Sequence, residues 1–143
     1  MKNKTPILLF LLSVFYLNCA TVAQERGYNK KENSTFMFYN VENLFDTVDD
    51  PQIMDEDFTP QSEKKWTIKR YQKKLSNLSR VIELVNINEL PEFIALAEVE
   101  NKTVLEDLCK TEVLCEAKYG IVHHESNDGR GIDVGLLYRT DEF

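Results

Sequence analysis

The stretch "FMFYNVENLFD", residues 36–46, joins a strand pattern to a polar one. Its first four residues are aromatic or apolar, a composition that favours a buried strand. The apolar run stops at Asn40, and acidic and amide side chains follow at once. Two interpretations stay open: Asn40 shapes a turn after the strand, or the strand delivers its amide to a reaction centre.

Outward from this stretch, strand and helix patterns alternate along the chain. Apolar residues spaced by three and four indicate a helix over 68–85, and a second helix is expected at 101–115. Short apolar runs complete the set of expected strands, which is 35–41, 92–99, 119–124 and 132–139. The order strand, helix, strand, helix, strand, strand predicts an α/β fold that ends in a hairpin.

The last expected strand predicts a sheet with an uncovered face. Two helices can cover only one face of a four-stranded sheet, yet Val134, Leu136 and Leu137 make the fourth strand apolar on both sides. The other face is therefore expected to need a partner layer, and the sequence looks truncated after residue 143.

An export signal is expected at residues 1–23, followed by a polar lead-in at 24–34. Two lysines precede an apolar run that is too short to span a bilayer, and small residues favour cleavage after Ala23. Lipid attachment at Cys19 is the alternative. The chain is therefore predicted to be periplasmic or secreted, or an outer-membrane lipoprotein, with no transmembrane domain.

Composition narrows the possible partners. The 143 residues are 43% hydrophobic, which suits one modest globular domain, and the formal net charge is −7. A chain this acidic does not attract nucleic acid by its bulk charge. Handling phosphates would therefore need a local basic patch or a bound cation.

Two cysteines, Cys109 and Cys115, follow the expected signal. Export would permit a disulfide between them. Because both fall in or beside one expected helix, they are poorly placed for that bond unless the helix ends between them. We expect two free, half-buried thiols.

Polar side chains follow the apolar strands at three places. Asn40 ends the first strand and Glu98 follows "FIALA" in the second, while Glu125, Arg130 and Asp133 surround the turn between the last two. Sites in open α/β sheets form at such strand ends. Carboxylate and amide oxygens suit Mg²⁺, and an arginine can grip a phosphate with two hydrogen bonds.

Other polar groups have ordinary structural interpretations. The acidic loop after Asp46 lacks the spacing of an EF-hand and is expected to be a solvated surface. His123 and His124 are adjacent in a strand and must point to opposite faces, so one site cannot easily use both. The basic side chains of the first helix are expected to be solvated.

Three motifs together resemble a known family. "FYNVENLFD", "ALAEVEN" and "RGIDVGLLYR", in this order, resemble the start of the endonuclease/exonuclease/phosphatase superfamily, and exported bacterial members in particular. Ala97 stands where glutamine is usual, and the glutamate after it is present as Glu98. The resemblance covers residues 35–143. It implies the N-terminal half of a two-sheet α/β sandwich of the deoxyribonuclease I type.

The resemblance also implies a chemistry. Glu98 and Asn40 would bind Mg²⁺, with Mn²⁺ or Ca²⁺ as alternatives, in a phosphodiesterase that most resembles an endonuclease acting on nucleic acid. Glu125 would support a catalytic histidine, and Arg130 and Asp133 would contact the substrate. The family's later motifs, Asp-x-Asn and a terminal Asp-His, are absent from these 143 residues. We therefore expect an inactive, aggregation-prone fragment of an enzyme that is monomeric when complete.

Two other functions remain open at this stage. One is a non-catalytic exported α/β module that binds a partner through its bare sheet face. The other is a lipid or inositol phosphatase of the same family, which would share the metal site and differ in its specificity loops.

Overall fold

The computed structural model describes residues 33–86 and 88–142, so the expected signal at 1–23 and most of the lead-in lie outside the described residues. The elements follow the predicted order: β1 (Phe36–Leu44), the short 3₁₀ helix η1 (Glu56–Phe58), α2 (Ile68–Glu83), β2 (Phe93–Val99), α3 (Lys102–Cys109), β3 (Tyr119–His124) and β4 (Asp133–Arg139). None of the helices in this part of the chain is long and apolar enough to cross a membrane.

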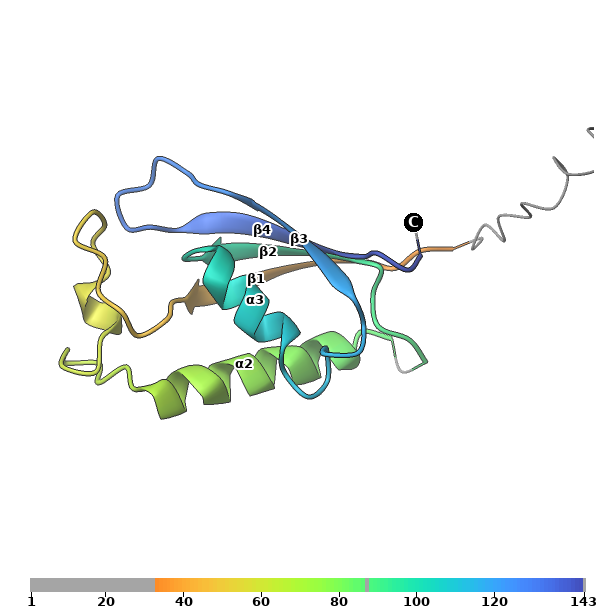
Figure 1. Ribbon diagram of the computed structural model, residues 1–143, viewed down its shortest axis with the longest axis horizontal. Helices are drawn as coiled ribbons and strands as arrows, with labels where there is room; N and C mark the ends of the chain where they lie inside the picture. The colour runs from red at the N-terminus through yellow and green to blue at the C-terminus, as the bar shows by residue number, and fades with distance from the viewer. Residues whose placement is uncertain (1–32, 87, 143) are drawn as a thin grey trace, which may run out of the picture. The chain divides into compact units, whose positions relative to one another are not determined.

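The described strands form a mixed sheet in the order β1-β2-β4-β3 (Figure 1). β1 and β2 run parallel, as strands joined by a helix can, while β4 is antiparallel to both β2 and β3. This topology brings the ends of β1, β2 and β3 and the start of β4 to one edge of the sheet. The predicted α/β class and terminal hairpin are confirmed.

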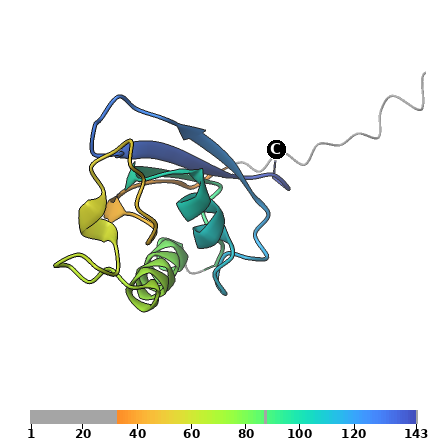
Figure 2. The ribbon, with the colours of Figure 1, turned by 60° about the vertical axis from the view of Figure 1, so that its left-hand side comes forward.

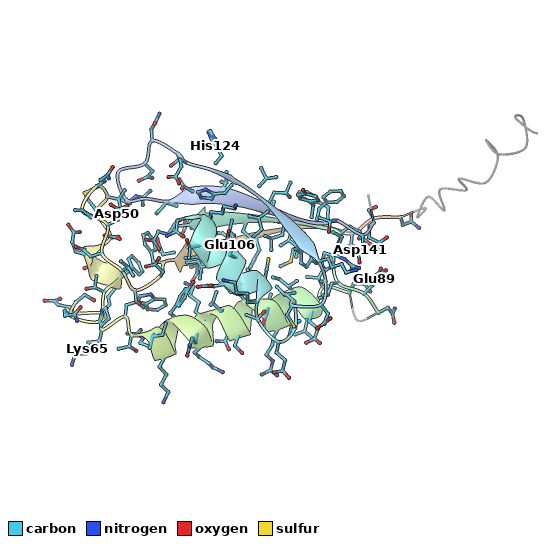
Figure 3. The ribbon with its side chains drawn as sticks, in the orientation of Figure 1. Asp50, Lys65, Glu89, Glu106, His124 and Asp141 are labelled. Atoms are coloured by element: carbon cyan, nitrogen blue, oxygen red, sulfur yellow. The ribbon has the colours of Figure 1, made fainter. Side chains whose placement is uncertain are left out.

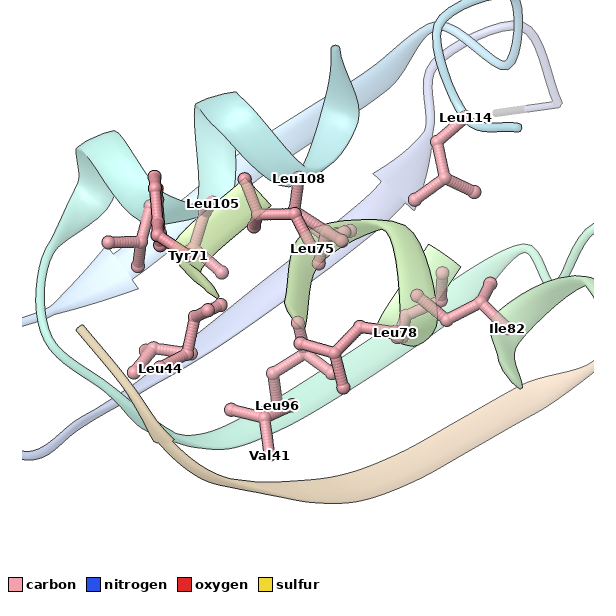
Figure 4. Packing of buried hydrophobic residues seen from close by; sticks show 14 of the residues in the cluster. Val41, Leu44, Tyr71, Leu75, Leu78, Ile82, Leu96, Leu105, Leu108 and Leu114 are labelled. Atoms are coloured by element: carbon pink, nitrogen blue, oxygen red, sulfur yellow. The ribbon is translucent and has the colours of Figure 1, made fainter. Parts of the chain in front are cut away.

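α2 and α3 pack on the same face of the sheet, as both views show (Figures 1 and 2). Their apolar stripes meet the inward side chains of the strands (Figure 4). The most deeply buried members of this core include Leu44, Ile82, Ile94, Leu96, Val99, Leu105, Leu108 and Leu137. Burying such side chains is the main stabilising contribution to the fold.

The opposite face of the sheet is apolar and exposed, as the fourth strand predicted. Phe38, Ala95, Leu136 and Val122 form one row across the four strands. Phe38 and Val122 are 68% and 53% exposed, and Val134 in the next row is 55% exposed. His124 projects from the side of the sheet away from α2 and α3 (Figure 3).

Two predicted boundaries were wrong. The second helix ends at Cys109 instead of residue 115. The chain turns at Thr111, whose hydroxyl donates to the Leu108 carbonyl at 2.7 Å, and the turn places Leu114 in the core. Cys109 and Cys115 are free thiols, as expected, but Cys115 is exposed. The first strand continues past residue 41 to Leu44 through an irregular segment described below.

The loop after β1 is folded against the core. Phe45 stacks on Phe58 with ring centroids 4.1 Å apart, and Trp66 Nε1 donates to the Phe45 carbonyl at 3.0 Å. The Asp46 N–H donates to Glu100 Oε2 at 2.6 Å. These contacts fix the position of the loop segment that follows β1, next to the ends of β1 and β2.

Candidate functional site

β2 contains a bulge at Glu98. Ile94 and Leu96 point into the core, and strict alternation would bury Glu98 next. Instead, Ala97 pairs with Val134 and Val99 pairs with Asp133, so Glu98 is the extra residue. Its φ of 64° turns the backbone and lets Val99 take the buried place. The bulge frees the Glu98 carboxylate to turn away from the core.

β1 is irregular at the same level. Asn40 pairs with Ala97, but the next pair joins Leu44 to Val99. Between them, Glu42 and Asn43 have φ values of 52° and 62°. Left-handed backbone at residues other than glycine costs on the order of 1 to 3 kcal/mol each and gathers at functional sites. Both strands therefore leave regular geometry at the point where sequence reasoning placed a reaction centre.

The irregular segments hold Glu98 between two donors. Asn40 Nδ2 donates to Glu98 Oε1 at 2.9 Å, and the Asn43 N–H donates to Oε2 at 3.1 Å. Asn40 Oδ1 in turn accepts the Glu42 N–H at 2.8 Å, which fixes the orientation of the amide. The two residues predicted from separate strands therefore lie in direct contact, and the carboxylate has one defined position.

Lys74 of α2 supports the irregular segment of β1 that holds Glu98. Its Nζ donates to the carbonyls of Glu42 and Asn43, at 2.5 and 3.1 Å. Burial lowers the pKa of Lys74, while the Glu42 and Glu98 carboxylates act in the opposite direction. The expectation that the basic side chains of this helix are solvated is wrong for Lys74. Nothing local to its sequence distinguishes it from Lys73.

The donor atoms at this edge fit a hard divalent cation. A carboxylate has about four lone-pair positions, and each Glu98 oxygen accepts one hydrogen bond from the residues above. The remaining positions can meet an ion that keeps most of its waters, as Mg²⁺ does in phosphate-handling sites. Glu98 is the residue that would hold the ion. Asn40 is placed to orient the Glu98 carboxylate, and its own predicted contact with the metal stays a prediction.

The β3–β4 turn places Arg130 at the surface. Its guanidinium forms a two-pronged ion pair with Asp128, at 3.0 and 2.7 Å. This contact lowers the pKa of Asp128 to about 2. Arg130 is accessible to a phosphate, provided that it exchanges the carboxylate for the new partner.

Asp133 and Glu125 lie beside a histidine. Asp133, at 3% exposure, is buried on the side of the sheet that faces the helices, and the Ser126 N–H donates to its Oδ1 at 2.7 Å. His123 Nε2 lies 3.1 Å from Asp133 Oδ2, and its Nδ1 lies 3.7 Å from Glu125 Oε1. The substrate contact predicted for Asp133 stays a prediction, and its carboxylate in this structure faces His123.

The two histidines point to opposite faces, as predicted. His123 pairs with the buried Gly135, and His124 pairs with the exposed Val134. The sequence pattern alone leaves open which of the two lies inside. The signal was the alternation of Asp133, Gly135 and Leu137, which marks the inward side of β4 and, through the register, the inward histidine.

Comparison with known proteins identifies the family. A model described as the endonuclease/exonuclease/phosphatase family matches residues 35–143. The chain belongs to this family. The matched residues include all the strands and helices described above, and membership indicates a hydrolase of the phosphodiesterase and phosphatase type. No curated protein and no solved structure matches the chain.

Proposed function

We propose that this chain carries the metal-binding part of a Mg²⁺-dependent phosphodiester hydrolase that acts on nucleic acid. The observation that carries the proposal is the Glu98 carboxylate, held by Asn40 and Asn43 where two adjacent strands leave regular geometry. Strain of this kind around one carboxylate, in a chain of the endonuclease/exonuclease/phosphatase family, favours a role in chemistry over a role in folding.

Each residue has a separate task in this proposal. Glu98 binds the ion, and Asn40 keeps the carboxylate oriented through its amide. Bound Mg²⁺ would polarise a phosphoryl oxygen and stabilise charge on the leaving group. Arg130 binds a second phosphate oxygen after it exchanges Asp128, and Lys74 holds the backbone that presents the Asn43 N–H to Glu98.

A basic hollow beside this site favours a polymeric, phosphate-rich substrate. It is lined by Trp66, Lys69, Arg70, Lys73, Lys74 and Asn77. The local basic patch that an acidic chain would need is therefore present on α2. Positive side chains along one surface suit the phosphate backbone of a nucleic acid.

The test replaces Glu98 with glutamine, which keeps the size of the side chain and removes its charge. We expect Glu98→Gln to weaken Mn²⁺ binding, measured calorimetrically on this chain, by at least about 100-fold, because losing even a supporting group of a metal ligand costs 10- to 100-fold. Glu106→Gln on the exposed surface of α3 is the matched control and should bind as the parent does.

Activity is measured on the protein as its gene encodes it. We expect Mg²⁺-dependent cleavage of plasmid DNA or RNA that Glu98→Gln abolishes and Glu106→Gln retains. Cleavage that survives Glu98→Gln would reject Glu98 as the ligand. Turnover of sphingomyelin or inositol phosphates, with nucleic acid left intact, would reject the nucleic-acid assignment and keep the metal site.

A further inference from the structure

Two buried polar atoms at the β3–β4 end of the sheet make no hydrogen bond and face only each other. Among the described residues, three buried side-chain atoms make no hydrogen bond: Asp55 Oδ1, His123 Nε2 and Asp133 Oδ2. The last two face each other across 3.1 Å, on side chains that are only 7% and 2% exposed. An unsatisfied buried polar group costs about 1 to 3 kcal/mol, so a pair of them at one point needs an explanation.

The separation of these two atoms is that of neighbouring ligands on one ion. Nitrogen and oxygen ligands lie about 2.0 to 2.2 Å from Zn²⁺. At tetrahedral to octahedral angles, two such ligands are about 2.8 to 3.6 Å apart. His123 Nε2 and Asp133 Oδ2, at 3.1 Å, fall within this range.

The surrounding contacts orient the two side chains as supporting groups orient metal ligands. The Ser126 N–H occupies Asp133 Oδ1, so that Oδ2 is the oxygen left facing His123. Ser126 is itself fixed, because its hydroxyl donates to the Ile132 carbonyl at 2.8 Å. Fixing one carboxylate oxygen to present the other is common around bound metal ions.

Glu125 offers a third carboxylate beside this pair. Its side chain is 80% exposed, and its Oε1 lies 3.7 Å from His123 Nδ1, the other ring nitrogen, so it would have to swing toward Nε2 to share an ion with Asp133. One ligand atom from each of His123, Glu125 and Asp133 lies within 4.8 Å of the other two. Within residues 33–86 and 88–142, no other set of three histidine, cysteine or acidic side chains meets this distance.

We propose that His123, Asp133 and Glu125 bind a divalent transition-metal ion, with Zn²⁺ as the best match, separately from the ion at Glu98. One imidazole with two carboxylates suits Zn²⁺ and its neighbours, whereas Mg²⁺ and Ca²⁺ prefer oxygen ligands alone. The ion ties the inward side of β3 to the start of β4 and so holds the turn that carries Arg130. The inference does not depend on the proposed hydrolase activity.

The test is Zn²⁺ binding by the full, metal-stripped chain, measured by calorimetry. We expect one tight site. His123→Gln and Asp133→Asn should each weaken it by at least about 100-fold, and Glu125→Gln by about tenfold. His124→Gln is the matched control, since it changes the adjacent histidine on the other face, and it should bind Zn²⁺ as the parent does.

A second readout identifies the ligands directly. Co²⁺ in place of Zn²⁺ should give visible absorption bands of a nitrogen- and oxygen-bound ion, without the thiolate charge-transfer band that Cys109 or Cys115 would produce. Circular dichroism checks folding, and if Asp133→Asn unfolds, His123→Gln and the exposed Glu125→Gln decide. A thiolate band, tight binding retained in His123→Gln, or no tight site in the parent would overturn the proposal and leave a plain imidazole–carboxylate contact.

Discussion

Two groups of polar residues lie along one edge of the sheet, one where β1 and β2 end and one at the β3–β4 turn. They differ in whether the backbone or the side chains carry the energetic cost. At the β1–β2 end, Asn40 and Glu98 have hydrogen-bond partners, and the backbone takes the strain through positive φ at Glu42, Asn43 and Glu98. At the β3–β4 end, the left-handed residue of the turn is a glycine, Gly131. There the cost lies in two buried side-chain atoms, His123 Nε2 and Asp133 Oδ2, which make no hydrogen bond.

This difference separates two kinds of site. The Glu98 carboxylate is positioned by folding, because Asn40 and Asn43 donate to it, and Lys74 holds the backbone of Glu42 and Asn43, before any ligand arrives. The pair of His123 and Asp133 keeps two atoms unsatisfied until a ligand arrives. The first arrangement suits catalysis, where geometry must be ready in advance. The second suits an ion that stabilises the folded state by binding to it.

The largest expected effect comes from a glycine under α3 at the β3–β4 end. A Cβ on Gly135 would lie 2.5 Å from Leu105 Cδ1, and Leu105 is fully buried. Because the core has no room to yield, we expect Gly135→Val to destabilise the fold by about 3 kcal/mol, as overpacking does. Urea unfolding measures it. The neighbouring Val134→Ala, on the exposed face, should change stability by less than about 0.5 kcal/mol.

If Gly135→Val leaves the free energy of unfolding almost unchanged, α3 does not pack tightly on β4. His123, which pairs with Gly135, would then be less well buried than the structure indicates. The argument that His123 Nε2 is a buried atom without a hydrogen bond would then fail.

Lys74 should have the next largest effect, at the other end. Lys74→Met keeps the apolar stem and removes two charge-assisted hydrogen bonds to the carbonyls of Glu42 and Asn43. We expect a loss of about 2 kcal/mol in unfolding free energy, and about a tenfold loss of Mn²⁺ affinity, since the backbone that presents the Asn43 N–H to Glu98 loses its support. Lys73→Met, one residue earlier on the exposed side, is the control. Equal effects of the two changes would contradict the supporting role.

Features set by the pattern of neighbouring residues could be predicted from the sequence, whereas contacts made by tertiary packing between distant segments could not. The pairing of Asn40 with Glu98 was predictable, because parallel strands bring their carboxyl ends to one edge. Lys74 was not, since it reaches the site from α2 by tertiary packing alone. The bulge left one trace in the sequence: Val99, not Glu98, continues the apolar pattern after Leu96, which indicates a skipped residue in the alternation.

A buried acid at the β1–β2 end should make stability depend on pH. Burial raises the pKa of Glu100 to about 7. The hydrogen bond from the Asp46 N–H acts against this rise, while the charges of Asp46 and Asp55 add to it. Between about pH 4.5 and pH 7 the folded state therefore binds more protons than the unfolded chain, so stability falls as pH rises through this range. We expect a fall of about 1 to 2 kcal/mol, measured by urea unfolding at several pH values.

Glu100→Gln is the matched variant for this measurement. It keeps an oxygen to accept the Asp46 N–H and removes the titrating group. The dependence on pH should shrink and not vanish, because burial also raises the pKa of Asp55. An unchanged slope in Glu100→Gln would place the effect elsewhere.

The smallest expected effect tests the strain itself. The side chain of Glu42 is exposed, while its φ of 52° favours glycine. We expect Glu42→Gly to stabilise the fold by about 0.5 to 1 kcal/mol relative to Glu42→Ala, because both remove the same carboxylate and only glycine relieves the left-handed backbone. Thermal unfolding of the two variants measures the difference. If alanine is as stable as glycine, the backbone at this end is not strained, and the contrast with the β3–β4 end rests on side chains alone.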